Sequence, residues 1–228
     1  MSSGCYVTGT DTGVGKTLVA ASLLVALQTQ RIRAVGMKPV ASGCDATAAG
    51  LRNADALQLI ACSAGEPIYA DVNPYAFVEP IAPHIAAADA GVVVEIDAIK
   101  AAHARLAGCV SHVVVEGVGG WMAPLGPRLM QSDLVRALRL PVILVVGLRL
   151  GCISHALLSA RAIRDDGCEL LGWIGSGVDP SMLRRADNVD TLRERLHAPC
   201  LGVLPFMGSP TPAASAERLA QARAALAG

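Results

Sequence analysis

An apolar run that leads directly into a glycine-rich turn is the feature that most constrains this chain. Cys5-Tyr6-Val7 is followed by Gly-Thr-Asp-Thr-Gly-Val-Gly-Lys-Thr at residues 9–17, and a helical pattern begins there. Glycines allow backbone angles that other residues avoid, and they let N–H groups approach a ligand closely. A helix that starts at such a turn points its free N–H groups and its positive dipole end at the ligand. The segment is therefore typical of a loop that binds nucleotide phosphates.

Residues within this loop have separable roles. Lys16 is expected to reach the terminal phosphates, and the Thr17 hydroxyl is the usual inner-shell magnesium ligand. The first glycine is Gly9, one residue earlier than the standard Gly-x-x-x-x-Gly-Lys-[Ser/Thr] spacing requires. The pattern therefore predicts a variant phosphate-binding loop, with a chance glycine-rich turn as the alternative. The residues expected around the phosphates are Gly13, Val14, Gly15, Lys16, Thr17 and Leu18.

Length and charge limit the class of protein. The chain has 228 residues, with 19 Lys plus Arg and 19 Asp plus Glu, so its formal net charge is zero. This length favours one α/β domain spanning residues 1–228. A neutral chain gives no reason to expect binding to nucleic acid or to an anionic membrane. The arginines at 184–185 and 193–195 have acidic neighbours, which indicates a solvated helix face.

Cysteine usage and the amino terminus indicate a cytoplasmic protein. The seven cysteines are widely spaced and form no Cys-x-x-Cys pair, so neither a zinc site nor a disulfide framework is predicted. Most are expected to be small buried residues in a reducing cytosol. No signal peptide is visible before the phosphate-binding motif. The longest apolar stretches, 18–27 and 141–148, are too short to span a bilayer.

Apolar runs alternate with helical patterns along most of the chain. The predicted strands are 5–8, 34–37, 112–116, 142–146, 170–174 and 201–204, and the predicted helices are 16–30, 55–64, 96–107, 132–138, 154–166, 181–196 and 213–227. Continuous Val/Ile/Leu runs favour strands that are covered on both faces. We therefore expect an α/β fold of the P-loop NTPase type: a doubly wound, mostly parallel sheet with helices on both faces. Residues 65–94, which carry four prolines, are expected to be loop with short helical pieces that cap one side of the sheet.

A carboxylate follows one of these apolar runs. Glu116 comes directly after three valines and is expected at a strand tip close to the phosphate loop, where it could bind magnesium directly or through water. The alternative is a glutamate that simply ends a strand at the surface. Gly117, Gly119 and Gly120 would allow close approach by a ligand or form a tight turn.

Two further charged residues belong to the same predicted edge of the sheet. Lys38 ends the second strand and is expected to point into the ligand crevice, because ligands collect at the carboxyl ends of parallel strands. Asp55 opens a helix, where the helix dipole stabilises a carboxylate. Together with Thr17 and Glu116, Asp55 becomes a candidate for a third oxygen ligand of magnesium.

Several blocks of sequence, taken together, resemble ATP-dependent dethiobiotin synthetase. They are residues 8–17, 38–43, 50–57, 72–75, 83–85, 115–121, 140–147 and 150–156. The resemblance extends from residue 4 to about residue 207. Many nucleotide hydrolases share the phosphate loop, whereas Lys-Pro-Val-Ala-Ser-Gly at 38–43 and the block at 50–57 are much more specific.

The resemblance implies an ATP-dependent cyclo-ligase that forms C–N bonds and uses Mg²⁺. That family makes dethiobiotin, in the penultimate step of biotin synthesis, from 7,8-diaminononanoate, carbon dioxide or bicarbonate, and ATP. The diamine becomes a carbamate, and the carbamate attacks the γ-phosphate to give a carbamic–phosphoric anhydride. The second amine then closes the ring and expels phosphate.

The resemblance also implies roles for particular residues. Lys38, Lys16 and Thr12 would be catalytic, with Lys38 stabilising the carbamate and Thr12 orienting the substrate. Ser42 would hydrogen-bond the carbamate or an amine. The metal ligands would be Thr17, Asp55 and Glu116. Further nucleotide-binding residues would be Asp55, Glu116, Gly117, Val118, Gly119, Ser176, Gly177, Pro205, Phe206 and Met207.

A shared active site is a further implication. In the family, the far carboxylate of the substrate binds a helix amino terminus of the partner subunit, and the matching segment here is Gly151, Cys152, Ile153 and Ser154. A glycine turn into a helix start suits an anion, although an ordinary N-cap at Ser154 is equally compatible. The implied assembly is a homodimer with shared active sites.

The chain departs from the family at two places. Many members carry glutamate where this chain has Gly13. The block that reads adenine usually runs Val-Ala-Asn-Asp, whereas here it is Ile-Gly-Ser-Gly at 174–177. An amide can pair with the adenine edge as donor and acceptor together, and Ser176 is too short to do so. We therefore hypothesise poor discrimination among nucleoside triphosphates, or a preference for a base other than adenine.

Two other classes share this type of loop. Cobyrinate amidating synthetases need a glutamine-hydrolysing domain, which is not expected here. Switch ATPases of the partitioning or septum-site type usually carry a second lysine inside the loop, before the glycines. Residues 10–12 are Thr-Asp-Thr, and no basic amphipathic tail follows. Both classes are weaker interpretations than a ligase.

Overall fold

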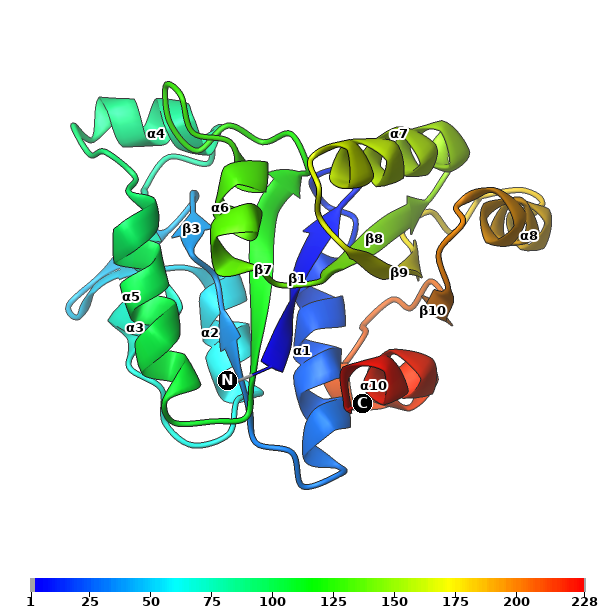
Figure 1. Cartoon of the computed structure of the whole chain (residues 1–228), viewed down its shortest axis with the longest axis horizontal. Coiled ribbons are helices and arrows are strands. Elements are labelled where there is room, and N and C mark those ends of the chain that lie inside the picture. Colours follow the sequence, from blue (N-terminus) through cyan, green and yellow to red (C-terminus); the bar gives the residue numbers. More distant parts are fainter. Residues whose placement is uncertain (1–2, 228) are drawn as a thin grey trace.

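A parallel sheet organises the part of the chain that the computed structural model describes, residues 3–227. Within that range its strands run in the order β10-β9-β8-β1-β7-β2, and all neighbours pair in parallel (Figure 1). The strands are β1 (Ser3–Gly9), β2 (Ala34–Met37), β7 (His112–Gly120), β8 (Val142–Leu148), β9 (Leu170–Gly177) and β10 (Cys200–Leu204). The predicted doubly wound α/β fold is confirmed.

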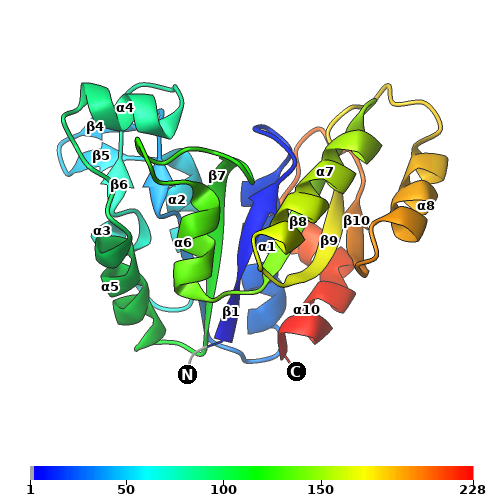
Figure 2. The same cartoon turned by 45° about the horizontal axis from the view of Figure 1, so that its top comes forward.

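Helices cover both faces of this sheet. They are α1 (Lys16–Gln28), α2 (Ala54–Ala61), α3 (Tyr69–Val72), α4 (Pro83–Asp89), α5 (Ile96–Ala107), α6 (Gln131–Leu138), α7 (Cys152–Asp165), α8 (Arg185–Arg195), α9 (Pro212–Ala216), the 3₁₀ turn η1 (Glu217–Leu219) and α10 (Ala220–Ala227). Helices α1, α2 and α10 pack on one face, and α5, α6 and α7 pack on the other (Figure 2).

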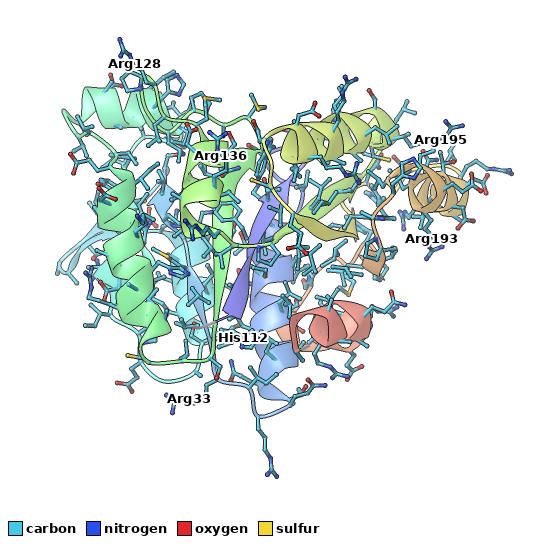
Figure 3. The ribbon with its side chains drawn as sticks, viewed as in Figure 1. Arg33, His112, Arg128, Arg136, Arg193 and Arg195 are labelled. Atoms are coloured by element: carbon cyan, nitrogen blue, oxygen red, sulfur yellow. The ribbon has the colours of Figure 1, made fainter. Side chains whose placement is uncertain are left out.

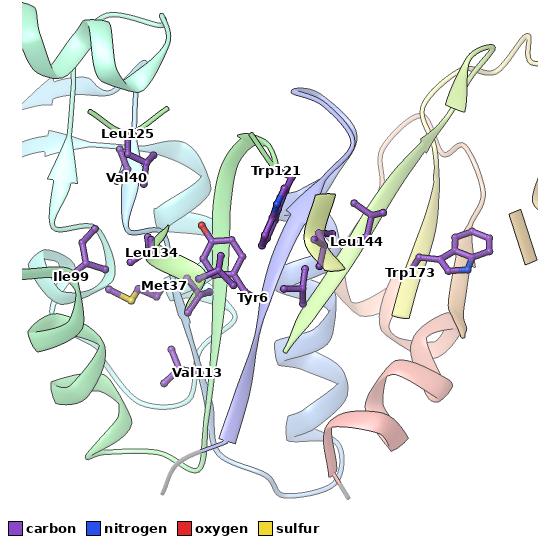
Figure 4. Packing of buried hydrophobic residues seen from close by; sticks show 14 of the residues in the cluster. Tyr6, Met37, Val40, Ile99, Val113, Trp121, Leu125, Leu134, Leu144 and Trp173 are labelled. Atoms are coloured by element: carbon purple, nitrogen blue, oxygen red, sulfur yellow. The ribbon is translucent and has the colours of Figure 1, made fainter. Parts of the chain in front are cut away.

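The strands are apolar on both sides because both sides are covered. Successive side chains of a strand point to opposite faces. In β1, Tyr6 joins the core on the α5–α7 side, whereas Cys5 and Val7 join the core under α1. In β7, Val113 faces the first core and Val114 the second (Figure 4). This packing explains the continuous apolar runs in the sequence.

Helix α1 is buried around most of its circumference. Val19, Leu23, Leu24 and Leu27 are fully inaccessible to solvent. One side of α1 meets the sheet, and α9, η1 and α10 also pack against α1, while η1 and α10 contact β10 as well. A helix that is apolar all round needs these additional contacts. The final predicted helix, 213–227, is thus a cover for α1, and it is interrupted by η1.

Two small sheets, which the sequence did not predict, lie in the region between β2 and α5. Strand β3 (Val40–Ala41) pairs in parallel with β6 (Tyr75–Ala76), and β4 (Asp45–Thr47) pairs with β5 (Gly50–Arg52) as a hairpin. With α3 and α4, they occupy residues 40–89 beside the carboxyl end of β2 (Figure 2). The predicted loop at 65–94 therefore contains α3, β6 and α4.

Several predicted boundaries are wrong by a few residues. Strand β7 continues to Gly120, so Glu116 does not end it. Helix α7 begins at Cys152, with Gly151 as its N-cap at φ 93°, and Ser154 is therefore not the cap. Helix α8 begins at Arg185 rather than at residue 181, because Arg184 has φ 51° and cannot continue a right-handed helix.

Polar contacts attach some of the helices to the sheet and stabilise others internally. His112 Nε2, at the start of β7, lies 2.8 Å from the Leu226 carbonyl oxygen and ties α10 to the sheet (Figure 3). Arg193 pairs with Asp190 at 2.8 Å on α8, consistent with the predicted solvated face.

Among residues 3–227, no helix combines the length and apolar character needed to cross a bilayer.

Candidate functional site

The carboxyl ends of β1, β7 and β2 border a cavity of about 810 Å³. The sheet register places the charged residues there: Val7 pairs with Glu116, and Met37 pairs with Val115, so Lys38 follows directly beside Glu116. The predicted residues that line this cavity are Thr12, Gly13, Gly15, Lys16, Thr17, Lys38, Ser42, Asp55, Glu116, Val118 and Gly119.

The phosphate-binding loop has the backbone that the sequence predicts. Gly13 and Gly15 have φ of 72° and 88°, in the left-handed region that favours glycine. Gly15 is the N-cap of α1, and no side chain caps the helix, so its first N–H groups are free for a ligand. The Val14 side chain is buried against Gly147 of β8, which fixes the loop on the sheet.

Lys16 is held by its own loop. Its side chain is largely buried, and Nζ donates a hydrogen bond of 2.9 Å to the Asp11 carbonyl oxygen. Burial lowers the pKa of the Lys16 ammonium to about 8, and the nearby Lys38 charge acts in the same direction. The Asp11 carboxylate accepts from the Thr12 N–H at 2.7 Å and pairs with Arg149. The loop is thus braced before any phosphate is bound.

Lys38 lies between two carboxylates. Its Nζ donates to Asp55 Oδ2 at 2.8 Å and to Glu116 Oε1 at 2.6 Å. The Thr17 hydroxyl donates to the same Glu116 oxygen at 2.8 Å. Lys38 is 4% exposed and Glu116 is 1% exposed, so this ion pair is removed from solvent. Glu116 lies within β7 but one residue past the last β2–β7 pair, and it therefore faces the cavity edge.

Burial and mutual attraction oppose each other in this cluster. Burial raises the pKa of the Glu116 carboxyl above its ordinary value, although Lys38 pulls it down. Burial alone would lower the pKa of Lys38, but the Glu116 and Asp55 carboxylates raise it. Burial would raise the pKa of Asp55, and the Lys38 charge reverses this and lowers it. Lys38 therefore stays protonated while it is paired with the two carboxylates.

The donor set fits magnesium. Thr17, Asp55 and Glu116 offer the oxygen atoms that Mg²⁺ prefers. Glu116 Oε2 is buried and has no hydrogen-bond partner, so it retains an unused acceptor. No group of three or more His, Cys, Asp or Glu side chains within residues 3–227 could hold a metal by itself. Phosphate oxygens and water would therefore have to complete the coordination shell.

The residues predicted to read the base lie away from the cavity. Strands β9 and β10 are on the opposite side of β1 from β7 and β2. A Cβ on Gly15 would come within 2.6 Å of Ser176 Oγ, and one on Gly177 within 2.4 Å of the Phe206 nitrogen. Phe206 is 42% exposed. Ser176, Gly177 and the segment 205–207 therefore group beside the phosphate loop, on its other flank.

The remaining predicted residues lie elsewhere. Gly151, Cys152, Ile153 and Ser154 form the start of α7 and do not line the cavity. Leu18 and Gly117 do not line the cavity either. A Cβ on Gly117 would meet the Gln131 side chain at 2.4 Å, so this glycine is needed for packing under the site.

Sequence reasoning missed a buried glutamine below the site. Gln131 is inaccessible to solvent; its Oε1 accepts from the Val118 N–H at 2.8 Å, and its Nε2 donates to the Gly120 carbonyl at 2.9 Å. This amide keeps the end of β7 extended past Glu116. Gly120, which was expected to allow close approach by a ligand, also lines the cavity, and the other missed lining residues are Ala41, Asn53, Pro80, Ile81, Ala82, Pro83, Ala123 and Pro124. Of these, only Asn53 carries a local signal, as a helix N-cap.

Comparisons with known proteins agree on one family. A family model described as an AAA domain matches residues 3–214. The ATP-dependent dethiobiotin synthetase BioD of Xanthomonas oryzae pv. oryzae (strain PXO99A) is 55% identical over 214 residues, which cover 94% of this chain and 96% of the relative. The proteins with the same name from Xanthomonas campestris pv. campestris (strain ATCC 33913) and Xylella fastidiosa (strain 9a5c) are 54% and 52% identical. The Xanthomonas campestris alignment covers 95% of this chain and 95% of the relative. The Xylella fastidiosa alignment covers 90% of this chain and 91% of the relative.

Similarity to solved structures is confined to the fold. The MinC:MinD cell division protein complex of Aquifex aeolicus matches with a TM-score of 0.55 and 12% identity, over 91% of this chain and 82% of that chain. The signal recognition particle receptor FtsY from Elizabethkingia anophelis matches with a TM-score of 0.50 and 16% identity, over 96% and 65%. Both support the P-loop type of sheet.

Proposed function

The chain belongs to the family of ATP-dependent dethiobiotin synthetases, and from this premise we propose how its own residues carry out the reaction. It is an ATP-dependent ligase of biotin biosynthesis. The observation that carries the residue-level proposal is the convergence of Lys16, Lys38 and two carboxylates on one cavity beside the phosphate loop. The substrates are 7,8-diaminononanoate, CO₂ or bicarbonate, and a nucleoside triphosphate.

The first task is to bring two anions together. A carbamate forms when one amine of the substrate adds to CO₂ and loses a proton, and it must then approach a triphosphate. Lys16 lies in the loop that surrounds the phosphates, and its buried ammonium would turn from the Asp11 carbonyl to a phosphate oxygen. Lys38 would face the carbamate. Fixed cations in a site with little water stabilise developing charge much more than they would in bulk solvent.

The carbamate oxygen would then attack the γ-phosphorus and release ADP. The product is a carbamic–phosphoric anhydride, whose carbonyl the second amine attacks to close the ring and expel phosphate. Ring closure is intramolecular, so positioning supplies much of the rate. Thr12 and Ser42 line the same cavity as Lys38 and would hold the substrate by hydrogen bonds. Ala41, Ile81 and Ala123 supply apolar wall for the carbon chain.

Magnesium would be held by Thr17, Asp55 and Glu116. The support is the oxygen donor set and the unpartnered buried Oε2 of Glu116. When bound, the ion supplies positive charge to the phosphate oxygens at the point of transfer. The role of the chain is to keep the three ligands within reach. Thr17 and Glu116 already share a hydrogen bond of 2.8 Å, and Lys38 already occupies the space between the two carboxylates.

The protein would work in the cytoplasm as a homodimer with shared active sites. Leu150 is 93% exposed and lies just before α7 begins. Leu158 is 65% exposed and lies on α7 itself. Large exposed apolar side chains mark interaction surfaces when they lie together. The N-terminus of α7, residues 151–154, would receive the substrate carboxylate of the partner subunit.

The direct test is product formation. The protein is incubated with 7,8-diaminononanoate, bicarbonate and Mg-ATP, and dethiobiotin is measured by mass spectrometry. Omission of any one substrate should abolish the product. A wild-type protein that binds nucleotide but makes no dethiobiotin would refute the proposed function.

Base preference is tested separately. Ser176 stands where an amide would read adenine, and the exposed Phe206 offers only stacking. We therefore expect ATP, CTP and GTP to bind with affinities within about tenfold of each other, because no paired donor and acceptor distinguishes them. Calorimetric titration of the three nucleotides with magnesium would measure this. A strong preference for ATP would contradict it.

A further inference from the structure

The backbone of Lys38 is held by the end of α3 and by the Asn73 side chain rather than by the sheet. Lys38 lies one residue beyond the last pair of β2 and β7, Met37 with Val115, where sheet hydrogen bonds stop. Its N–H instead donates to the Val72 carbonyl at 2.8 Å, at the end of α3. Its carbonyl accepts from Asn73 Nδ2 at 2.7 Å. Buried backbone groups need such partners, and Asn73 takes the place of a missing neighbouring strand.

Asn73 uses both ends of its amide. It is 4% exposed, and Nδ2 also donates to the Tyr75 carbonyl at 3.1 Å. Its Oδ1 accepts from the Tyr69 hydroxyl at 3.0 Å. An amide with both groups engaged has one allowed orientation. Asn73 therefore joins the end of β2, the start of β6 and helix α3 in one fixed arrangement.

The Tyr69 hydroxyl extends this connection to α2. It accepts from the Asn53 N–H at 2.7 Å, and Asn53 is the N-cap of α2 through its bond from Ala56 N. Asp55 lies in the first turn of that helix. The Arg52 guanidinium lies 4.1 Å from the centre of the Tyr69 ring and holds the ring in place. Helices α2 and α3 lie side by side at this end of the sheet (Figure 2).

The Tyr69 hydroxyl thus connects the segment that carries Lys38 with the segment that carries Asp55, and these two side chains form an ion pair. Lys38 is fixed through Asn73, and Asp55 is fixed through Asn53; Tyr69 bonds to both. The Lys38 Nζ and Asp55 Oδ2 atoms lie 2.8 Å apart. Neither Tyr69 nor Asn73 lines the cavity.

We propose that Tyr69 and Asn73 are positioning residues that set where the Lys38 ammonium and the Asp55 carboxylate stand in the active site. This inference rests on the role proposed above for Lys38. The network touches β2, β6, α2 and α3 but makes no hydrogen bond to the phosphate loop. Its loss should therefore reduce turnover, while the affinity for ATP measured without magnesium, which does not depend on Asp55, is kept.

The test compares two variants with two matched controls. Tyr69→Phe removes only the bridging hydroxyl, and Asn73→Ala removes both arms of the amide. We expect kcat to fall about 10-fold and about 100-fold respectively, because an error near 1 Å in a reacting group costs about that much. The dissociation constant for ATP measured without magnesium should change less than about twofold, because the phosphate loop is intact. Tyr75→Phe loses a hydroxyl that accepts only from the Glu95 N–H, and Asn188→Ala loses a solvent-side amide on α8; both should match wild type.

A second measurement separates positioning from loss of structure. In a Lys38→Ala background, with product followed by mass spectrometry over long incubations, Asn73→Ala should cause a much smaller further loss, because the lysine that it positions is gone and only the positioning of Asp55 remains. An equal loss in both backgrounds would overturn the proposal, as would wild-type turnover in Tyr69→Phe and Asn73→Ala. A wild-type protein that makes no dethiobiotin would instead refute the proposed function, so the two failures are distinguishable.

Discussion

Among single residues, Lys38 has two separable effects, on turnover and on stability. Lys38→Ala should lower kcat by about 10²–10³-fold, as the loss of an electrostatic group at a transition state does. The same change leaves Glu116 buried without its cation, which should lower the free energy of unfolding by about 3–5 kcal/mol. Steady-state kinetics and urea unfolding would measure the two effects, and nucleotide affinity should survive.

Lys100→Ala is the matched control for this substitution. Lys100 is half-exposed on α5 and lies 3.6 Å from Asp97. Exposed pairs of this kind contribute less than about 0.5 kcal/mol. Turnover and stability should therefore both stay close to wild type. Normal turnover in Lys38→Ala would show that the role assigned to Lys38 is wrong.

The lowered pKa of Lys16 predicts how nucleotide affinity depends on pH. The pKa of about 8 in the free protein should rise when phosphates replace the Asp11 carbonyl as its partner. The affinity gained from this charge is fully present below pH 8. It should be lost as the pH rises from about 8 to the higher pKa of the complex, with proton uptake on binding in that window.

Calorimetry in two buffers of different ionisation enthalpy measures this proton uptake directly. Lys16→Arg serves as the control, because arginine stays charged throughout the range. Its binding should show no proton uptake between pH 7 and pH 9.5. Equal proton counts for wild type at about pH 7 and about pH 9 would rule out the assigned shift.

For secondary-structure elements, the two left-handed glycines of the phosphate loop should differ. A Cβ on Gly15 would lie 2.6 Å from Ser176 Oγ, whereas one on Gly13 would meet nothing within 4 Å. Gly13→Ala should therefore cost only the backbone strain, about 1–2 kcal/mol of stability. Gly15→Ala should cost the same strain and also push the loop away from β9, weakening nucleotide binding at least about tenfold.

Thermal unfolding and nucleotide titration of both variants would measure the difference. Equal affinities would show that the contact between the loop and β9 does not shape the phosphate site. The comparison also bears on the family pattern, because a side chain at position 13 has open space in this chain.

How far sequence predicts an element depends on whether its cause is local. The valine run at 113–115 and the helix 96–107 were predicted because their patterns are self-contained, and α5 has those bounds. Strand β7 extends to Gly120 because the distant Gln131 amide binds its end, which no local pattern reveals. Strands β3 and β6 have two residues each, too few to show a period of two.

The candidate site follows the same rule. The phosphate loop, Lys38 and Glu116 were predicted from motifs and strand ends, and the structure brings them together around one cavity. Their assigned roles stay predictions. Tyr69 and Asn73 lie 14 to 35 positions from the residues they hold, and their connection depends on tertiary packing. Such residues could not be found by reading the chain in order.

For the whole molecule, shared active sites can be tested with a mixed dimer. Lys38→Ala should disable the chemistry of its own protomer, and Ser154→Glu places a negative charge where the partner's substrate carboxylate would bind. Both homodimers should be poorly active. A heterodimer purified through two different tags contains one intact site of two, so it should regain about half of wild-type activity.

The outcome distinguishes the two arrangements of the site. If each protomer built its site alone, every site in the heterodimer would carry one defect and activity would not return. Ser154→Glu itself should fold normally, because a carboxylate in the first turn of α7 is favoured by the helix dipole. Size-exclusion chromatography with light scattering would report the oligomeric state of each sample.

The lysine that stands between Asp55 and Glu116 gives the resting enzyme an internal counter-ion. Free divalent metal in the surrounding solution meets a pair of carboxylates whose negative charge is already partly offset, so it would bind there only weakly by itself. The ion would instead arrive chelated by the triphosphate and release the lysine as it binds. Entry of the nucleotide would thereby free Lys38 for the diamine, and we expect the triphosphate to bind first.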